Sequence, residues 1–157
     1  MGAAPFIPVP RSSASFVRVA GYSGTPLPKK LGIKPGAKLA LVSAPGDFDR
    51  VLGQLPEGVK AVALGRAKGP FDVVVAFFER EAAFQRQLPN LHAVLEPNGG
   101  LWIAWPKRAS GVTTDMTEHV VRKHGLPRGL VDNKVCAIDA TWSGLRLVVR
   151  LENRPHG

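Results

Sequence analysis

The chain has 157 residues, the size of one ordinary domain, and 45% of them are hydrophobic, which excludes a wholly disordered protein. Lys and Arg number 21 against 12 Asp and Glu, giving a formal net charge of +9. No apolar run approaches the roughly 18 residues of a membrane-spanning helix. The single Cys136 excludes an intramolecular disulfide framework and fits a reducing compartment. We therefore expect a basic cytoplasmic protein with no membrane partner.

The positive charge is concentrated at the two ends of the sequence. Residues 1–36 hold five basic residues and no acidic one, residues 37–105 hold seven of each sign, and residues 106–157 hold nine basic and five acidic residues. If the ends meet in the fold, they form a positive face that attracts phosphates or acidic partners. The alternative is that these charges serve only solubility.

Residues 1–20 are predicted to be a disordered tail. The stretch MGAAPFIPVPRSSAS places three prolines within six positions and then a serine cluster, a composition typical of extended, unpacked chain. The predicted domain covers residues 21–152, and residues 153–157 are expected to be a frayed end.

Within the domain, short apolar strands alternate with helices. Strands are predicted at 37–42, 59–64, 71–78, 101–105, 134–139 and 144–151, and the main helices at 48–55, 79–95 and 115–124. Interleaved helices imply right-handed crossovers between parallel strands, whereas the last two strands are close enough only for an antiparallel hairpin. The sequence thus predicts an α/β, three-layer Rossmann-like sandwich, with a mostly parallel sheet of about six strands ending in that hairpin.

This pattern resembles a reduced class I methyltransferase fold, the S-adenosylmethionine-dependent Rossmann-like sheet with a reversed last strand. Leu31–Gly36 leading into Leu39–Val42 looks like the entry to its first strand, Phe71–Val75 like its fourth, and Val94–Ile103 like its Pro-x-Gly-Gly turn and fifth strand. Only one strand fits between the first-strand helix and Phe71. The resemblance therefore implies that one strand–helix unit of the full fold is missing.

A closer resemblance covers residues 21 to about 154. The strings YSGTPLPKKLGIKPG, GGLWIAWPKRASGVTTDMTE and GLVDNKVCAIDATWSGLRLV look like an uncharacterised family of small bacterial proteins, a domain of unknown function. This resemblance implies the fold and no particular reaction.

Two features of the sequence disfavour S-adenosylmethionine as a cofactor. The fold's cofactor loop uses several glycines after its first strand, but here Ser43-Ala44-Pro45-Gly46-Asp47 has one glycine and a proline. The fold also uses an acidic residue at the end of its second strand to hold the ribose, and Val62–Arg66 has none. The candidate cofactor-binding residues are Ser43, Gly46 and Asp47, with capping of the following helix as the alternative role of Asp47.

A second group of candidates follows the later strands, because loops at the carboxyl ends of parallel strands line the ligand crevice. The predicted crevice residues are Lys107, Arg108, Ser110, Thr113, Thr114, Asp139 and Trp142. Lys107 and Asp139 are the candidate acid–base groups. The alternatives are a solvated loop around Lys107 and a Trp142 that only clamps the hairpin.

Several chemistries lack their motifs. The four histidines have no metal-ligand spacing, and there is no HExxH, GxSxG or GxxxxGK[ST] pattern, so no metal site is predicted. The leading hypothesis is a noncatalytic methyltransferase-like domain that binds a small anionic ligand or a protein partner. The alternative is an S-adenosylmethionine-dependent methyltransferase, or another enzyme, with an unusual cofactor loop. The third is a nucleic-acid-binding module.

Overall fold

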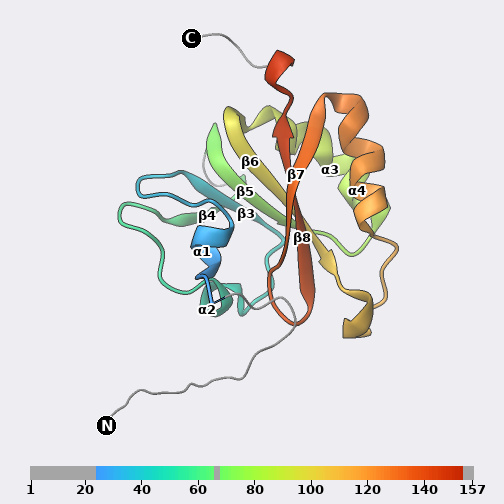
Figure 1. Ribbon diagram of the computed structural model, residues 1–157, viewed down its shortest axis with the longest axis horizontal. Helices are drawn as coiled ribbons and strands as arrows, with labels where there is room; N and C mark the ends of the chain where they lie inside the picture. The colour runs from blue at the N-terminus through green and yellow to red at the C-terminus, as the bar shows by residue number, and fades with distance from the viewer. Residues whose placement is uncertain (1–23, 66–67, 154–157) are drawn as a thin grey trace.

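The computed structural model describes residues 24–65 and 68–153. Six strands form one sheet in the order β4-β3-β5-β6-β8-β7 (Figure 1). The strands are β3 (Leu39–Val42), β4 (Ala61–Ala63), β5 (Phe71–Phe77), β6 (Leu95–Pro106), β7 (Leu130–Ala137) and β8 (Trp142–Val149). The pairs from β4 to β6 are parallel, and β6–β8 and β8–β7 are antiparallel. The predicted fold class is confirmed. The tail expected at residues 1–20 lies outside the described residues, as do residues 154–157.

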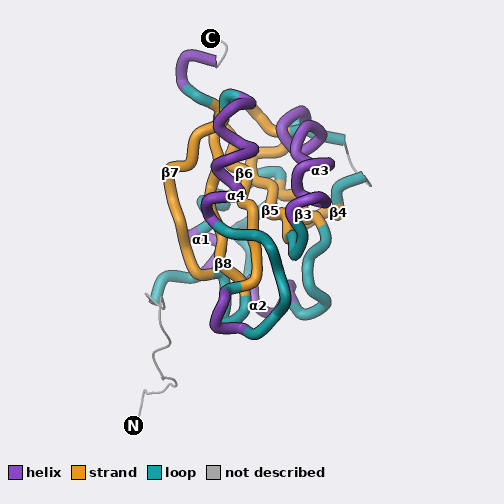
Figure 2. Tube along the Cα trace, turned by 90° about the vertical axis from the view of Figure 1, so that its right-hand side faces the viewer, coloured by secondary structure: helices purple, strands orange, loops and turns teal. Residues whose placement is uncertain are grey.

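Helices cover both faces of the sheet. They are α1 (Leu27–Lys30), α2 (Phe48–Leu52), α3 (Glu81–Ala93) and α4 (Glu118–Gly125). The first two pack on one face, while α3 and α4 lie side by side on the other, as Figure 2 shows. None of the described helices is long and apolar enough to cross a membrane.

The two faces of β5 belong to two separate cores. Val73, Val75 and Phe77 pack with the layer of α1 and α2. Val74 and Ala76 pack with the layer of α3 and α4. Successive side chains of a strand point to opposite faces, so only an almost entirely apolar strand can satisfy both layers. This is why the most apolar run of the sequence lies in the middle of the sheet.

The edge strand β4 marks the place of the missing unit. It has three residues and pairs only with β3. The chain then returns to β5 through residues 64–70, with no helix in the described part of that connection. The sheet therefore ends where the full fold would continue with a further strand and helix.

The sequence-based bounds were wrong at two strands. β6 starts at Leu95 and includes Gly99 and Gly100, which were predicted as a turn. A Cβ on Gly100 would meet the guanidinium of Arg146, and one on Gly99 would lie 2.9 Å from the Asp72 carbonyl oxygen. These glycines permit close packing inside a strand rather than a reversal of the chain. β7 likewise starts at Leu130, before its predicted start.

Candidate functional site

The sheet has a topological switch point between β3 and β5. From β3 the chain moves outward to β4 and then crosses to the other side of β3 to form β5. The connections that follow β3 and β5 therefore leave the carboxyl edge in opposite directions. Open α/β sheets bind ligands in the crevice that this divergence opens.

A cavity of about 450 Å³ occupies this position. It is lined by residues from the end of β3, the end of β5, the start of α3 and the start of β8, namely Ser43, Pro45, Phe77, Phe78, Glu79, Arg80, Ala83, Gln87 and Trp142. We call it the switch-point cavity. Its volume is in the range of small-ligand pockets.

Aromatic rings form one wall of the switch-point cavity. The Trp142 ring meets the Phe77 ring edge-on, with centroids 5.0 Å apart and planes at 90°. Phe77 in turn contacts Phe48 of α2 at 4.9 Å. Trp142 reaches the cavity because β8 is antiparallel, so its first residue lies opposite Pro106 at the carboxyl end of β6. The half-buried indole thus combines a fixed apolar surface with access to a ligand.

Two charged residues, Glu79 and Arg80, line the same cavity. Both side chains are exposed, and neither forms an ion pair with another residue in the described ranges. Their backbone is held in place, because the Glu79 carbonyl oxygen accepts a 2.7 Å hydrogen bond from the Thr114 hydroxyl. The cavity therefore offers one carboxylate and one guanidinium from a fixed segment.

The loop after β3 contributes less than predicted. Of the candidates Ser43, Gly46 and Asp47, only Ser43 is among the cavity-lining residues. Ser43 has φ of 55°, a backbone conformation usually taken by glycine. Asp47 occupies the N-cap position of α2, but its side chain makes no capping hydrogen bond, so the predicted cap is wrong.

The loop after β6 borders a second cavity of about 550 Å³, which we call the β6 cavity. Among the predicted crevice residues it is lined by Arg108, Thr113 and Thr114. Ser110 is used within the loop, since its hydroxyl donates to the Lys107 carbonyl oxygen at 2.6 Å and accepts from the Val112 amide at 3.2 Å. The predicted crevice residues therefore do not form a single site.

Asp115 does not begin the helix that was predicted at residues 115–124. The helix predicted to start at Asp115 starts at Glu118, and Thr117 caps it by accepting from the Val120 amide at 3.1 Å. The Asp115 carboxylate accepts instead from the Glu81 amide at 2.7 Å, so it caps α3. An N-cap usually precedes its own helix, and only the tertiary fold brings Asp115 to another helix.

The candidate acid–base groups Lys107 and Asp139 are both tied to the hairpin turn and line neither cavity. The Asp139 carboxylate accepts from the Thr141 and Trp142 amides, both at 2.8 Å, which is a turn-forming role. The Lys107 amide donates to the Thr141 carbonyl oxygen at 2.7 Å. Neither residue is among those that line the switch-point cavity or the β6 cavity.

An ion cluster joins α3 to α4 behind these loops. The Glu81 carboxylate lies 2.7 Å from Nε2 of His124 and 3.1 Å from Nζ of Lys123. Hydrogen bonding to His124, and then to Lys123, lowers the pKa of Glu81 below its usual value. Within residues 24–65 and 68–153, no group of three His, Cys, Asp or Glu side chains is arranged to hold a metal ion.

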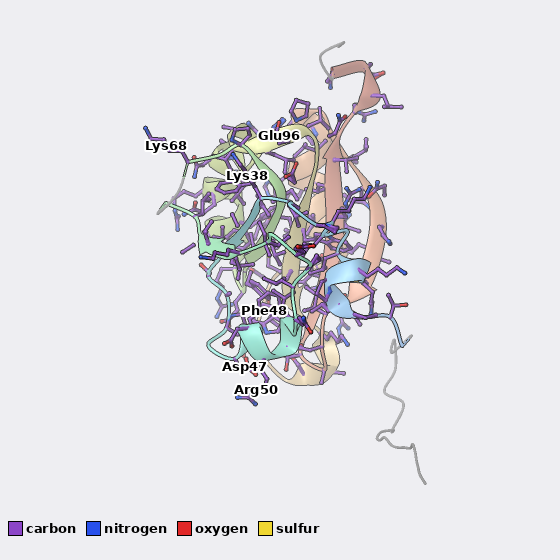
Figure 3. The ribbon with its side chains drawn as sticks, turned by 90° about the vertical axis from the view of Figure 1, so that its left-hand side faces the viewer. Lys38, Asp47, Phe48, Arg50, Lys68 and Glu96 are labelled. Carbon is purple, nitrogen blue, oxygen red and sulfur yellow. The ribbon has the colours of Figure 1, made fainter. Side chains whose placement is uncertain are left out.

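Sequence reasoning missed Glu79, Arg80 and Gln87. The signal was present, because the first two directly follow the strongest strand of the chain, where the crevice of a parallel sheet begins. They had been interpreted only as the start of a helix. Figure 3 shows the polarity of the sheet: Asp47 and Arg50 lie at its carboxyl end, and Lys38, Lys68 and Glu96 lie at the opposite end.

Three solved structures with a similar fold are methyltransferases. A SAM-dependent methyltransferase from Aquifex aeolicus is 16% identical, over 77% of this chain and 87% of that one, with a TM-score of 0.57. The ribosomal protein L11 methylase of Lactobacillus delbrueckii subsp. bulgaricus is 14% identical, over 79% and 75%, with a TM-score of 0.56. Magnesium protoporphyrin IX methyltransferase from Synechocystis PCC 6803, with bound SAM, is 11% identical, over 78% and 74%, with a TM-score of 0.51.

No family model and no curated protein sequence matches this chain. At these identities the solved structures show the fold, which is the class I methyltransferase-like Rossmann fold.

Proposed function

We propose that this chain is an S-adenosylmethionine-dependent methyltransferase that binds its cofactor in the switch-point cavity. The observation that carries the proposal is the position of this cavity, between the carboxyl ends of β3 and β5, with an aromatic wall and a carboxylate. Likeness in fold to three methyltransferases, one with SAM bound, supports the same assignment. This reverses the sequence-based preference for a noncatalytic domain.

The residues of the cavity fit the amino-acid half of S-adenosylmethionine. Its sulfonium is a cation, and a cation is attracted to the rings of Trp142 and Phe77. Its ammonium and carboxylate complement Glu79 and Arg80. Ser43 takes the left-handed backbone conformation that glycine commonly supplies in a nucleotide-binding loop. One glycine in the loop is therefore less of an obstacle than the sequence suggested.

The fit is poorer for the ribose. β4 ends at Ala63, and the residues up to Arg66 include no carboxylate to accept hydrogen bonds from the ribose hydroxyls. Losing a charge-assisted bond of about 1.5–3 kcal/mol weakens binding by roughly one to two powers of ten. We therefore expect weak binding of S-adenosylmethionine, with most of the affinity from the amino-acid half.

When bound, S-adenosylmethionine supplies an electrophilic methyl group. Trp142 and Phe77 exclude water from one side of the cavity and orient the ligand by apolar contact. Glu79, the only carboxylate among the residues that line the switch-point cavity, would hold the ammonium of the ligand. Arg80 would hold the carboxylate of the ligand.

The test is calorimetry with S-adenosylmethionine and S-adenosylhomocysteine, paired with indole fluorescence. We expect both ligands to bind, Glu79→Gln to weaken binding several-fold, and Trp142→Phe to remove the fluorescence response. Glu57→Gln is the matched control, because Glu57 is an exposed carboxylate that precedes β4, at the opposite end of the sheet. No binding at millimolar ligand, or equal losses in Glu79→Gln and Glu57→Gln, would overturn the proposal.

A noncatalytic role in binding a small anion is the second candidate. The β6 cavity favours it, because the Arg108 guanidinium and the Thr113 hydroxyl line the same space. A thermal-shift series with phosphate and short dicarboxylates tests it. Stabilisation that Arg108→Gln abolishes, without any effect of S-adenosylmethionine, would favour this function over methyl transfer.

A further inference from the structure

Four cationic side chains gather on the β7–β8 edge of the sheet. Lys134 of β7 lies opposite Arg146 of β8, which lies opposite Trp102 of β6, so these three residues form one row across the strands. Trp102 packs in the core under α1 and α2, which places the whole row on that face. α3 and α4 lie on the other face (Figure 1).

Lys30 and Lys107 extend the row toward the carboxyl end of the sheet. The Lys30 ammonium donates to the Ala137 carbonyl oxygen at 3.2 Å, which places it beside β7. Lys107 directly follows β6 and is joined to the hairpin turn through Thr141. We call Lys30, Lys107, Lys134 and Arg146 the basic row.

The pKa of the Cys136 thiol depends on three of these lysines. Its half-buried thiol has a pKa above the usual value because burial disfavours the thiolate. The charges of Lys30, Lys134 and Lys107 act against that increase. This agrees with the placement of Lys30 beside Ala137 and of Lys134 on the same strand as Cys136.

Among the described residues, the β7–β8 hairpin itself brings few carboxylates to this face. The β7–β8 hairpin, residues 130–149, has two acidic residues, Asp132 and Asp139. Asp132 accepts from Arg122 of α4 at 3.1 Å, on the opposite face. Asp139 lies in the hairpin turn, beyond the end of β7, where its carboxylate accepts from two backbone amides.

The surroundings favour a phosphate backbone over an acidic protein surface. Protein interfaces have an apolar or aromatic anchor at their centre. The large hydrophobic side chains that are exposed in the described parts of the chain are Val112, Leu126, Val135 and Leu151. None belongs to the basic row, and Val135 lies opposite Leu145, whose side chain packs on the other face. Lysine and arginine charges alone are enough to bind nucleic-acid phosphates.

We propose that the basic row is a binding surface for the phosphate backbone of nucleic acid, without preference for sequence. The row and the switch-point cavity are separate, so this inference does not depend on binding of S-adenosylmethionine. The row draws on both basic ends of the sequence: Lys30 comes from the first segment, and Lys107, Lys134 and Arg146 come from the last.

The test measures fluorescence anisotropy of a labelled oligouridylate of about 20 nucleotides at several salt concentrations. The variant Lys107→Gln/Lys134→Gln removes two charges and no side-chain hydrogen bond among the described contacts. The control Lys38→Gln/Lys68→Gln removes the same net charge at the opposite end of the molecule (Figure 3). Circular dichroism compares folding of both variants. The single change Lys134→Gln, at an exposed position, provides a milder version.

We expect binding that weakens with salt, and a several-fold loss in Lys107→Gln/Lys134→Gln with the salt slope reduced by about 1.4, since each phosphate contact on a single strand contributes about 0.7. Lys134→Gln should reduce the salt slope by about half as much, and the control variant should bind the oligouridylate as the unchanged protein does. No binding at low salt, equal losses in the two double variants, or full competition by polyglutamate at equal charge would overturn the proposal.

Discussion

The two loops at the carboxyl end of the sheet are held by different forces. The loop after β3, residues 43–47, accepts backbone hydrogen bonds from α2. Next to it, the ring of Phe48 packs against Phe77, and Phe77 packs against Trp142. The loop after β6, residues 107–117, is joined to the start of α3 by two hydrogen bonds. The Thr114 hydroxyl donates to the Glu79 carbonyl oxygen, and the Asp115 carboxylate accepts from the Glu81 amide.

This difference explains which residues are available to a ligand. In the loop after β6, the hydroxyls of Ser110 and Thr114 form hydrogen bonds with the protein itself. Around the switch-point cavity, the wall consists of packed aromatic rings. Glu79 and Arg80 line the same cavity, and neither forms an ion pair within the described ranges. Five substitutions test the difference, from the largest expected effect to the smallest.

Phe48→Ala should break the apolar support of the loop after β3. Phe48 is 2% exposed and packs edge-on against Phe77, so its truncation leaves a cavity and should lower the free energy of unfolding by about 3–5 kcal/mol. Urea denaturation measures this change. A loss below about 1 kcal/mol would show that α2 contributes little to the fold.

Asp115→Ala should release the loop after β6 from α3. It removes the cap on the Glu81 amide, and we expect a loss of about 1–2 kcal/mol in denaturant unfolding. Asp47→Ala is the matched control, because Asp47 also occupies an N-cap position but makes no capping bond, and should change stability by less than about 0.5 kcal/mol. Similar losses in the two variants would contradict the assignment of the cap.

Thr114→Val keeps the shape of the side chain and removes its hydroxyl. That hydroxyl donates to the Glu79 carbonyl oxygen and accepts from the Met116 amide, so we expect a loss of about 1 kcal/mol. Thr113→Val, at an exposed position of the same cavity, is the control. If both variants unfold at the same urea concentration as the unchanged protein, the loop is not held by Thr114.

Ser43→Gly should stabilise the protein slightly. A non-glycine residue in the left-handed region is strained by roughly 1–2 kcal/mol, and the greater flexibility of glycine in the unfolded chain offsets part of the gain, leaving about 0.5 kcal/mol. The same change at Ser143, inside β8, should destabilise. A destabilised Ser43→Gly variant would mean that the serine hydroxyl itself supports the loop.

Glu81→Gln should have the smallest effect and should appear mainly in the pH dependence. The lowered pKa of Glu81 in the fold means that its contribution is fully present above the ordinary value of 4.5 and is lost as the pH falls through the lower folded value. In thermal unfolding at a series of pH values, the variant should therefore lose less stability over that acidic interval. Glu96→Gln, at the opposite end (Figure 3), serves as the control, and identical profiles for both variants would exclude the Glu81 contribution.

The strand pattern was predictable because it depends on local composition. The apolar run from Phe71 and the closing hairpin follow from periodicity and spacing alone, and the structure confirms both. The bounds of β6 were not predictable, since Gly99 and Gly100 look like a turn until the neighbouring Asp72 and Arg146 are placed. Local sequence does not reveal which atoms approach a glycine.

The sequence by itself determined the layers of this protein, because burial on both faces demands apolar strands and helices between them. Only the tertiary structure decided the use of each polar residue. Asp139 was a candidate acid–base group, but its carboxylate accepts from two amides of the hairpin turn. Asp115 was predicted to begin a helix, but its carboxylate accepts from the Glu81 amide of α3. Glu79 and Trp142 line one cavity because β8 runs antiparallel to β6, which places Trp142, the first residue of β8, at the carboxyl end of the sheet. Hydrogen-bond partners are set by distances in space, which a linear pattern of residues does not contain.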